Sequence, residues 1–427
     1  MNEDIKKILN YVEAHRNEYI DYLMMLLSEN TTNINHGIDG GYELNGQKFI
    51  IEKFKELGMI LDIFEPKEED LKKCAEASLG HNYNGRPNVV GTLKGSGGGK
   101  SLLINGHIDT MPFDNIDKWI NHPLKPSIHE GKIYARGAAD MKGGLVGAML
   151  AVSTLVKCDL KLKGDLVFQS VVDEEGGGNG TISCVVKGYK SDAAIVAEPT
   201  ELKLMPAHMG WVFFKLEVTG KALHSGMKNE GINAIEKIIK IIDGLNELEK
   251  EWLLKKRHPL LPPPTLNIGV IQGGMAGSVV PDYCMMDFGA HYTPNEADEN
   301  GLGSKIEKEI LDKIDLVCED DTWLKEHKPV IVKYQQGSPF EIKGNGDISK
   351  NIANSYKVVI NSKPDVVGCV YGCDARIINN YGNIPTIMFG PGSIKTAHAI
   401  NENIQVEEYM NYIKIMALTI YNWCNDK

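Results

Sequence analysis

The sequence predicts an α/β protein with a mostly parallel sheet, into which an α+β module is inserted. Short apolar runs alternate with helical patterns over residues 1–205, and this alternation is typical of parallel strands connected by helices. Over residues 206–336 the order of the expected elements changes to β-α-β-β-α-β. The α/β pattern returns over residues 337–427. We therefore expect a larger domain in two parts, 1–205 and 337–427, and an inserted domain over 206–336.

The elements of the first part follow from helical spacing of apolar residues and from short apolar runs. The first helix is expected to be amphipathic, and Gly58 ends the second. The third helix is rich in small residues. The expected helices are 4–27, 45–57, 143–156 and 181–187, and the expected strands are 88–93, 101–105, 165–172 and 193–197.

The insert and the last part are assigned in the same way. In the insert, a Gly/Pro-containing turn separates two of the strands, and the split order predicts a ferredoxin-like module. The last part ends in a closing helix. The insert is expected to contain strands 211–219, 265–271, 283–292 and 329–334 with helices 233–250 and 305–317, and the last part strands 366–370 and 386–389 with helix 406–422.

Composition excludes several classes of protein. The formal net charge is −11, whereas a sequence-independent nucleic-acid binder needs a basic surface. Eight cysteines are scattered without a C-x-x-C pair, as expected of reduced cysteines in a cytosolic protein. The first residues lack the apolar core of a signal peptide, and no apolar run is long enough to span a membrane. We expect a cytoplasmic protein that binds neither nucleic acid nor membrane.

Acidic and histidine residues follow three predicted strands directly. His107 and Asp109 follow the strand over 101–105, Glu174 and Glu175 follow 165–172, and Glu198 follows 193–197. Because ligands of open α/β sheets bind at the carboxyl ends of strands, these side chains should meet in one crevice. Two further candidates, from later loops, are Asp140 and His398.

A single carboxylate at a strand end usually caps a helix or faces solvent. Several carboxylates in one crevice repel each other, and divalent cations relieve that repulsion. Imidazoles combined with carboxylates favour Zn²⁺, Mn²⁺ or Co²⁺ over Mg²⁺ or Ca²⁺. The adjacent Glu174 and Glu175 cannot point the same way, so one can bind metal while the other faces the substrate water. The pattern predicts metal-assisted hydrolysis.

Five ordered motifs carry a family resemblance. GHIDT, YARGAADMKGG, DEEGG, AEP and GPG…AH resemble the dinuclear zinc aminoacylase/carboxypeptidase family, which includes acetylornithine deacetylase and succinyl-diaminopimelate desuccinylase. The resemblance extends over nearly the whole chain. It implies a catalytic domain of the zinc-peptidase type, with the insert as a lid or dimerisation domain.

The resemblance also implies the roles of individual residues. His107 and Glu198 would bind one divalent ion, Glu175 and His398 the other, and Asp140 would bridge them. Zinc is favoured, with cobalt or manganese as alternatives. Glu174 would be the general base, and Asp109 would hold the second nitrogen of His107. The peptide bond after Asp140 is often cis in this family.

Three further residues are assigned from the resemblance. His224 would reach the metal site of a partner subunit and stabilise the oxyanion, which implies a homodimer through the lid; the alternative is a surface histidine on a hairpin. Asn267 would contact the substrate. Arg376 would bind a substrate carboxylate, with a structural salt bridge as the alternative.

We expect a metal-dependent amide hydrolase, with deacylation of N-acyl amino acids as the first hypothesis and a metal-bridging water as the nucleophile. Di- or carboxypeptidase activity and deformylation of a small heterocyclic amide are alternatives within the family. A non-catalytic metal-binding or scaffold homologue is the alternative of another class. Many family members carry Arg where this chain has His291, and its absence argues against strict desuccinylase specificity.

Overall fold

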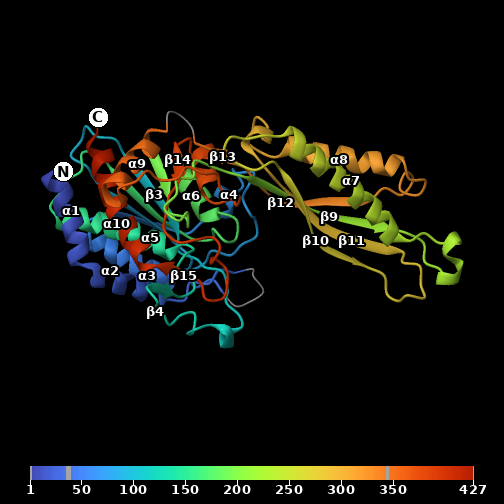
Figure 1. Ribbon diagram of the computed structural model, residues 1–427, viewed down its shortest axis with the longest axis horizontal. Helices are drawn as coiled ribbons and strands as arrows, with labels where there is room; N and C mark the ends of the chain where they lie inside the picture. Colours follow the sequence, from blue (N-terminus) through green and yellow to red (C-terminus); the bar gives the residue numbers. More distant parts are fainter. Residues whose placement is uncertain (1, 35–39, 343–345, 427) are drawn as a thin grey trace. The chain divides into compact units, whose positions relative to one another are not determined.

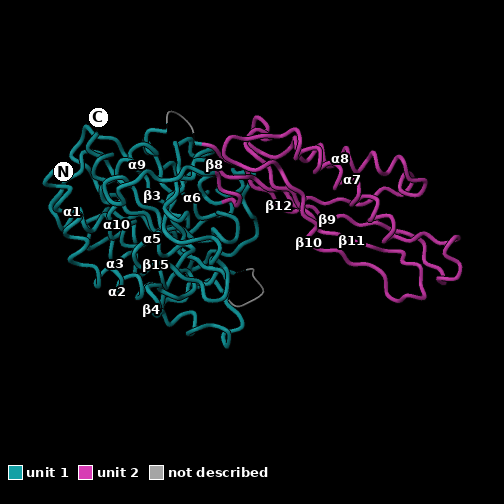
Figure 2. The backbone as a smooth tube through the Cα atoms, viewed as in Figure 1, with its two compact units in different colours: residues 1–206, 342–367, 373–427 teal, residues 207–341, 368–372 magenta. Residues whose placement is uncertain are grey.

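The computed structural model describes residues 2–34, 40–342 and 346–426. The chain forms two compact units (Figure 2). Unit 1 comprises residues 1–206, 342–367 and 373–427, and unit 2 comprises residues 207–341 and 368–372. Unit 2 and the predicted insert of 206–336 therefore overlap over most of their length.

A six-stranded sheet forms the centre of unit 1 among the described residues (Figure 1). Its order is β1-β2-β6-β3-β7-β14. The pairs from β6 to β14 are parallel, while β2 runs antiparallel to both of its neighbours, β1 and β6. The mostly parallel sheet predicted from the sequence is confirmed. Its strands are β1 Ile60–Phe64, β2 Asn88–Leu93, β3 Leu102–His107, β6 Leu166–Val171, β7 Ala193–Val196 and β14 Thr386–Met388.

Helices cover this sheet and exclude water from it. Every residue of β3, β6 and β7 is buried, as expected of parallel strands covered on both faces. The small residues of α5 let it pack closely: a Cβ on Gly147 would lie 2.7 Å from the ring of Tyr412 in α10. The unit 1 helices are α1 Glu3–Ala14, α2 Arg16–Leu27, α3 Glu43–Glu56, α4 Glu68–Leu71, α5 Lys142–Lys157, α6 Asn179–Val186, α9 Asp347–Ile360 and α10 Val406–Asn425. Among the described residues, none of the chain's helices is both long and apolar enough to span a bilayer.

Two predictions in unit 1 need correction, and several of its elements, β1 among them, were not predicted. The single helix over 4–27 is two helices, because His15 leaves helical geometry and its ring bonds to the carbonyl of Tyr11 at 2.8 Å. The strand expected over 366–370 is absent from the described residues, where Val366 and Cys369 form only isolated bridges. Helix α9 was not predicted. A small sheet was also missed; its strands are β4 Ser127–His129, β5 Lys132–Tyr134 and β15 Asn403–Gln405.

Unit 2 contains the split β-α-β-β-α-β order as an antiparallel sheet, β10-β11-β9-β12. Burial alternates along β9, so one face of the sheet packs under α7 and α8. Phe214, Phe288 and Trp252 are buried between sheet and helices. The elements are β8 Ala207–His208, β9 Gly210–Thr219, α7 Ala234–Lys255, β10 Thr265–Gly273, β11 Tyr283–Tyr292, α8 Ser304–Glu319, β12 Val330–Gly337 and β13 Phe340–Glu341, and β13 pairs with β8.

Candidate metal centre

Three neighbouring parallel strands bring the predicted residues to one edge of the unit 1 sheet. His107 is the last residue of β3, which lies between β6 and β7. Glu174 and Glu175 follow β6, and Glu198 follows β7. Parallel strands end at the same edge, and side chains that follow them share the space beyond it.

Asp140 lies between two imidazoles. Its Oδ1 is 3.1 Å from Nε2 of His107, and its Oδ2 is 3.2 Å from Nε2 of His398. That nitrogen of His398 is also 3.1 Å from Oε1 of Glu175. The Asp140–Met141 peptide bond is cis, as the resemblance implies.

Two groups of side chains could each hold a metal ion. One consists of His107, Asp140 and Glu198, and the other of Asp140, Glu175 and His398; within each group the ligand atoms lie within 4.8 Å of one another. Donor atoms about 2.1 Å from one tetrahedral ion lie roughly 3.4 Å apart, close to the spacings around Asp140. Among the described residues Glu198 Oε1 has no hydrogen-bond partner although it is buried, as expected of an oxygen reserved for a cation. The residues therefore fit two divalent ions.

The electrostatics of the cluster also call for positive charge. Burial raises the pKa of Glu198 well above its usual value, and the carboxylate of Asp140 raises it further. Burial alone would lower the pKa of His398, but hydrogen bonds to Asp140 and Glu175 raise it to about 11. Burial and the neighbouring carboxylates therefore favour protons on Glu198 and on His398. A divalent cation replaces those protons as the compensating charge.

Glu174 and Asp109 lie beside the two groups. Oε2 of Glu174 is 4.0 Å from Nε2 of His107, and the side chain is only 15% exposed. The buried carboxylate of Asp109 accepts the backbone N–H groups of Glu174 and Glu175 at 3.3 and 3.1 Å. Asp109 lies at the second nitrogen of His107, as predicted, but the contact is through its main chain: Nδ1 is 2.8 Å from the backbone carbonyl of Asp109 and 3.6 Å from its carboxylate. The amides draw the carboxylate toward the Glu174–Glu175 turn.

Sequence reasoning missed Glu402, which lies directly before β15. Pairing of β15 with β5 brings it beside Arg136, whose Nη1 donates to Glu402 Oε2 at 2.7 Å. Glu402 Oε1 accepts the N–H groups of Ala139 and Asp140 at 2.9 and 3.0 Å. Glu402 and Arg136 are buried. Arg136 belongs to the YARGAAD motif, but no local pattern marks Glu402 as its partner.

Arg376 forms a structural salt bridge, which was the alternative to a substrate contact in the sequence analysis. Its Nε donates to Glu76 at 2.9 Å, and its Nη1 and Nη2 donate to the carbonyls of Cys373 and Gly177. The residue is 2% exposed. The geometry thus gives no support to the predicted contact with a substrate carboxylate. Its neighbour Asp374 is also buried, and its Oδ2 accepts the hydroxyl of Thr181 at 2.6 Å.

His224 and Asn267 belong to unit 2, and their predicted roles toward the metal centre stay predictions. His224 is exposed before the 3₁₀ turn Ser225–Glu230, and its Nδ1 accepts the N–H of Gly226 at 3.1 Å. Asn267 is an exposed residue of β10 and pairs with Gly289 of β11.

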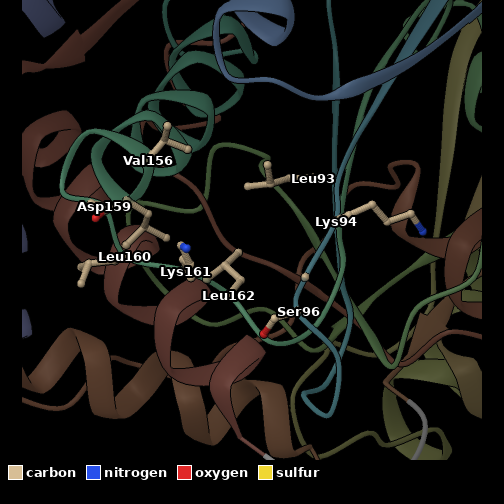
Figure 3. Close-up of a pocket in the computed structure, with 10 residues that line it drawn as sticks. Leu93, Lys94, Ser96, Val156, Asp159, Leu160, Lys161 and Leu162 are labelled. Carbon is tan, nitrogen blue, oxygen red and sulfur yellow. The ribbon is translucent and has the colours of Figure 1, made fainter.

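The pocket in Figure 3 is separate from the candidate centre. It has a volume of about 370 Å³, and its walls include Leu93, Val156 and Leu162. Leu93 ends β2 and pairs with Leu166, the first residue of β6. The pocket therefore lies at the amino end of β6, whereas the metal-binding candidates follow its carboxyl end.

Comparisons with known proteins give a consistent result. The model of "Peptidase family M20/M25/M40" matches residues 103–422. The N-formyl-4-amino-5-aminomethyl-2-methylpyrimidine deformylase of Halalkalibacterium halodurans is 34% identical over 373 residues, which are 80% of this chain and 84% of that protein. The protein of the same name from Bacillus subtilis is 30% identical over 100% of this chain and 99% of its own.

Two further matches are a relative with a different named activity and a solved structure that is similar in fold. The acetylornithine deacetylase of Myxococcus xanthus is 28% identical, over 80% of this chain and 85% of its own. The crystal structure of an M20 family metallo-carboxypeptidase from Sulfolobus solfataricus superposes with a TM-score of 0.74 at 20% identity, over 95% of this chain and 99% of that chain. This last likeness concerns the fold.

Proposed function

The chain belongs to peptidase family M20/M25/M40, and from this membership we propose the roles of its site residues and its substrate class. It is a metal-dependent hydrolase of C–N bonds in linear amides. The observation that carries the proposal is the pair of three-residue groups that share Asp140, with Glu174 beside them.

In the proposed centre, His107 and Glu198 hold one divalent ion, Glu175 and His398 hold the other, and Asp140 binds both. The distances around Asp140 support this assignment, as does Oε1 of Glu198, for which the described part of the chain offers no hydrogen-bond partner. We expect two zinc ions, with cobalt or manganese as substitutes, because the donor set mixes imidazole with carboxylate.

Glu174 acts as the general base in this proposal. Bound divalent ions would polarise the amide carbonyl and make water more acidic. Glu174 takes the proton of the attacking water and delivers it to the leaving nitrogen. Its carboxylate belongs to neither candidate metal group, so it is free for proton transfer, and Asp109 fixes its backbone N–H. In a dimer, His224 of unit 2 would stabilise the oxyanion of the partner subunit.

The substrate that we propose is the formamide of a small heterocyclic amine. From the sequence alone this substrate was an alternative, and N-acyl amino acids were the first hypothesis. Two deformylases at 34% and 30% identity support it. Side-chain chemistry agrees. The charge of Arg376 is compensated by Glu76, and burial lowers the pKa of His291, where many family members carry Arg. Neither position offers a free guanidinium to the carboxylate that an N-acyl amino acid would present.

Deacylation of N-acyl amino acids is the second candidate, supported by the deacetylase of Myxococcus xanthus at 28% identity. A formyl and an acetyl group differ by one methyl, and one methyl in a fitted pocket changes kcat/KM by about 10–200-fold. We would compare an N-formyl aminomethylpyrimidine, N-acetylornithine, other N-acetyl amino acids and dipeptides, with metal-loaded and chelated protein side by side. Preferred hydrolysis of N-acetylornithine would reject the formamide, and no hydrolysis of any amide would favour a non-catalytic homologue.

We also propose a homodimer that forms through unit 2. Strand β10 is an edge strand with exposed Val270 and Ile271, and such edges readily pair with another strand. Light scattering of the full chain tests this, and an active monomer would remove the role of His224. Eight buried free thiols support a reducing, cytoplasmic location.

A further inference from the structure

A buried arginine outside the candidate metal centre joins several segments of unit 1. Arg86 is 3% exposed and precedes β2. Its Nε lies 2.9 Å from both carboxylate oxygens of Glu43, and its Nη1 donates to the carbonyl of Asn82 at 2.9 Å. Its Nη2 donates to Asn33 at 2.9 Å and to Asp173 at 3.2 Å. One guanidinium thus bonds to four residues that are scattered in the sequence.

The first route from Arg86 to the catalytic turn passes through Asn33 and Asp109. Asn33 accepts from Arg86 through Oδ1 and donates through Nδ2 to Asp109 at 2.6 Å. The carboxylate of Asp109 accepts the N–H groups of Glu174 and Glu175. Asn33 and Asp109 are fully buried, so water does not compete with these bonds.

The second route passes through Asp173, the residue before Glu174. Asp173 has φ 64°, a left-handed conformation that residues with a side chain rarely adopt. Besides the bond from Arg86, the carboxylate of Asp173 accepts a hydrogen bond from the hydroxyl of Tyr83. It also lies 2.9 Å from Nδ1 of His81. A conformation of this kind persists only where the surroundings over-determine it.

We propose that Arg86 is a positioning residue that fixes the Glu174–Glu175 turn by both routes. One route holds the two backbone amides of the turn, and the other holds the backbone that enters it. This proposal rests on the proposed function, in which Glu174 is the base and Glu175 a metal ligand. Lysine cannot replace Arg86, because one ammonium group cannot reach Glu43, Asn33 and Asp173 in the planar geometry of a guanidinium.

The test is Arg86→Lys in the full chain, with Zn²⁺ as the metal probe. Loss of such an outer partner costs about 10–100-fold in activity or metal affinity. We expect kcat at saturating Zn²⁺ to fall within that range with little change in KM. We also expect calorimetric titration of the metal-free protein to show one weakened Zn²⁺ site. The control is Lys53→Met, which removes another buried cation. Lys53 pairs with Glu56 of the same helix, α3, and not with a residue of the candidate centre. The kcat and Zn²⁺ affinity of this variant should be normal.

Wild-type kcat and wild-type Zn²⁺ affinity in Arg86→Lys would overturn the proposal. If circular dichroism shows that Arg86→Lys does not fold, Asn33→Ala decides, because it cuts the first route without removing a charge. Asn33→Ala should also lower kcat and weaken one Zn²⁺ site, and normal values for both reject the proposal. Glu174→Gln distinguishes a failure of the proposed function from a failure of the positioning role. Activity in Glu174→Gln refutes the proposed base. An inactive Glu174→Gln together with a normal Arg86→Lys refutes only the positioning role of Arg86.

Discussion

Glu402 accepts the backbone N–H of Asp140 at 3.0 Å, and both residues are buried. Asp140 is the residue that the two candidate metal groups share. A carboxylate from the far end of the chain therefore fixes the position on which both groups depend. Its own charge is compensated by Arg136.

The first prediction concerns this anchor. Glu402→Gln keeps an oxygen for the N–H of Asp140 but leaves Arg136 without a counter-charge. Zn²⁺ affinity should fall about 10–100-fold, as for other partners behind metal ligands. Calorimetric titration measures this. Glu408→Gln is the matched control, since Glu408 accepts the N–H of Gly392 instead; equal Zn²⁺ affinity in the two variants would contradict the anchor role.

The second prediction separates base from ligand with two adjacent variants. Glu174→Gln should lower kcat by about 10²–10⁴ and leave the metal content unchanged, because an amide cannot take the proton of water. Glu175→Gln should instead weaken metal binding, because Glu175 belongs to one of the two groups. Metal analysis and steady-state kinetics on both variants check this. Near-normal turnover in Glu174→Gln would refute the assignment of the base.

The third prediction concerns metal removal. A chelator should abolish hydrolysis and lower the melting temperature, because the clustered carboxylates lose their compensating charge. A ligand present at 100 times its Kd stabilises a protein by about 2.7 kcal/mol. Thermal melts and assays before and after chelation measure both effects, and added Zn²⁺ should restore them together. Full activity after exhaustive chelation would contradict a metal-dependent centre.

The fourth prediction uses the close packing beneath Glu198. A Cβ on Gly144 in α5 would lie 1.9 Å from the carbonyl oxygen of Ala197, the residue before Glu198. Gly144→Ala should cost about 1–3 kcal/mol of stability through overpacking and should also weaken Zn²⁺ binding. Gly277→Ala is the control, because nothing lies within 4 Å of its added Cβ. A Gly144→Ala protein as stable as the control would show that the backbone yields easily.

The fifth prediction concerns pH and unit 2. Burial raises the pKa of Asp321, but hydrogen bonds from Lys237 and Lys240 lower it more, so its folded-state pKa lies below its usual value. The contribution of ionised Asp321 to the free energy of unfolding is therefore present above pH ~4, and it is lost as the pH falls through the folded-state pKa. Asp321→Asn should cost about 1.5–3 kcal/mol at pH 7. Melting curves against pH should converge for variant and wild type in acid; parallel curves would exclude this ion cluster as the cause.

Much of the fold could be predicted from periodicity. The strands β2 and β11 begin and end where the sequence places them. The strand over 366–370 was wrong because its apolar run forms only isolated bridges. Helix α9 was missed although Ile348, Ile352 and Tyr356 recur at helical spacing, so that signal was present in the sequence.

The sequence by itself placed His107, Glu175 and Glu198 together, because parallel strands bring the residues that follow them to one edge of the sheet. The grouping of these residues with Asp140 and His398 came from the family resemblance. Only the tertiary structure decided what holds those residues in place. Glu402, Arg86 and the amide contacts of Asp109 depend on side chains that meet from distant segments, and no local pattern records such meetings. The same reason applies to the ion pair of Arg376, because its partner, Glu76, lies 300 residues away in the sequence.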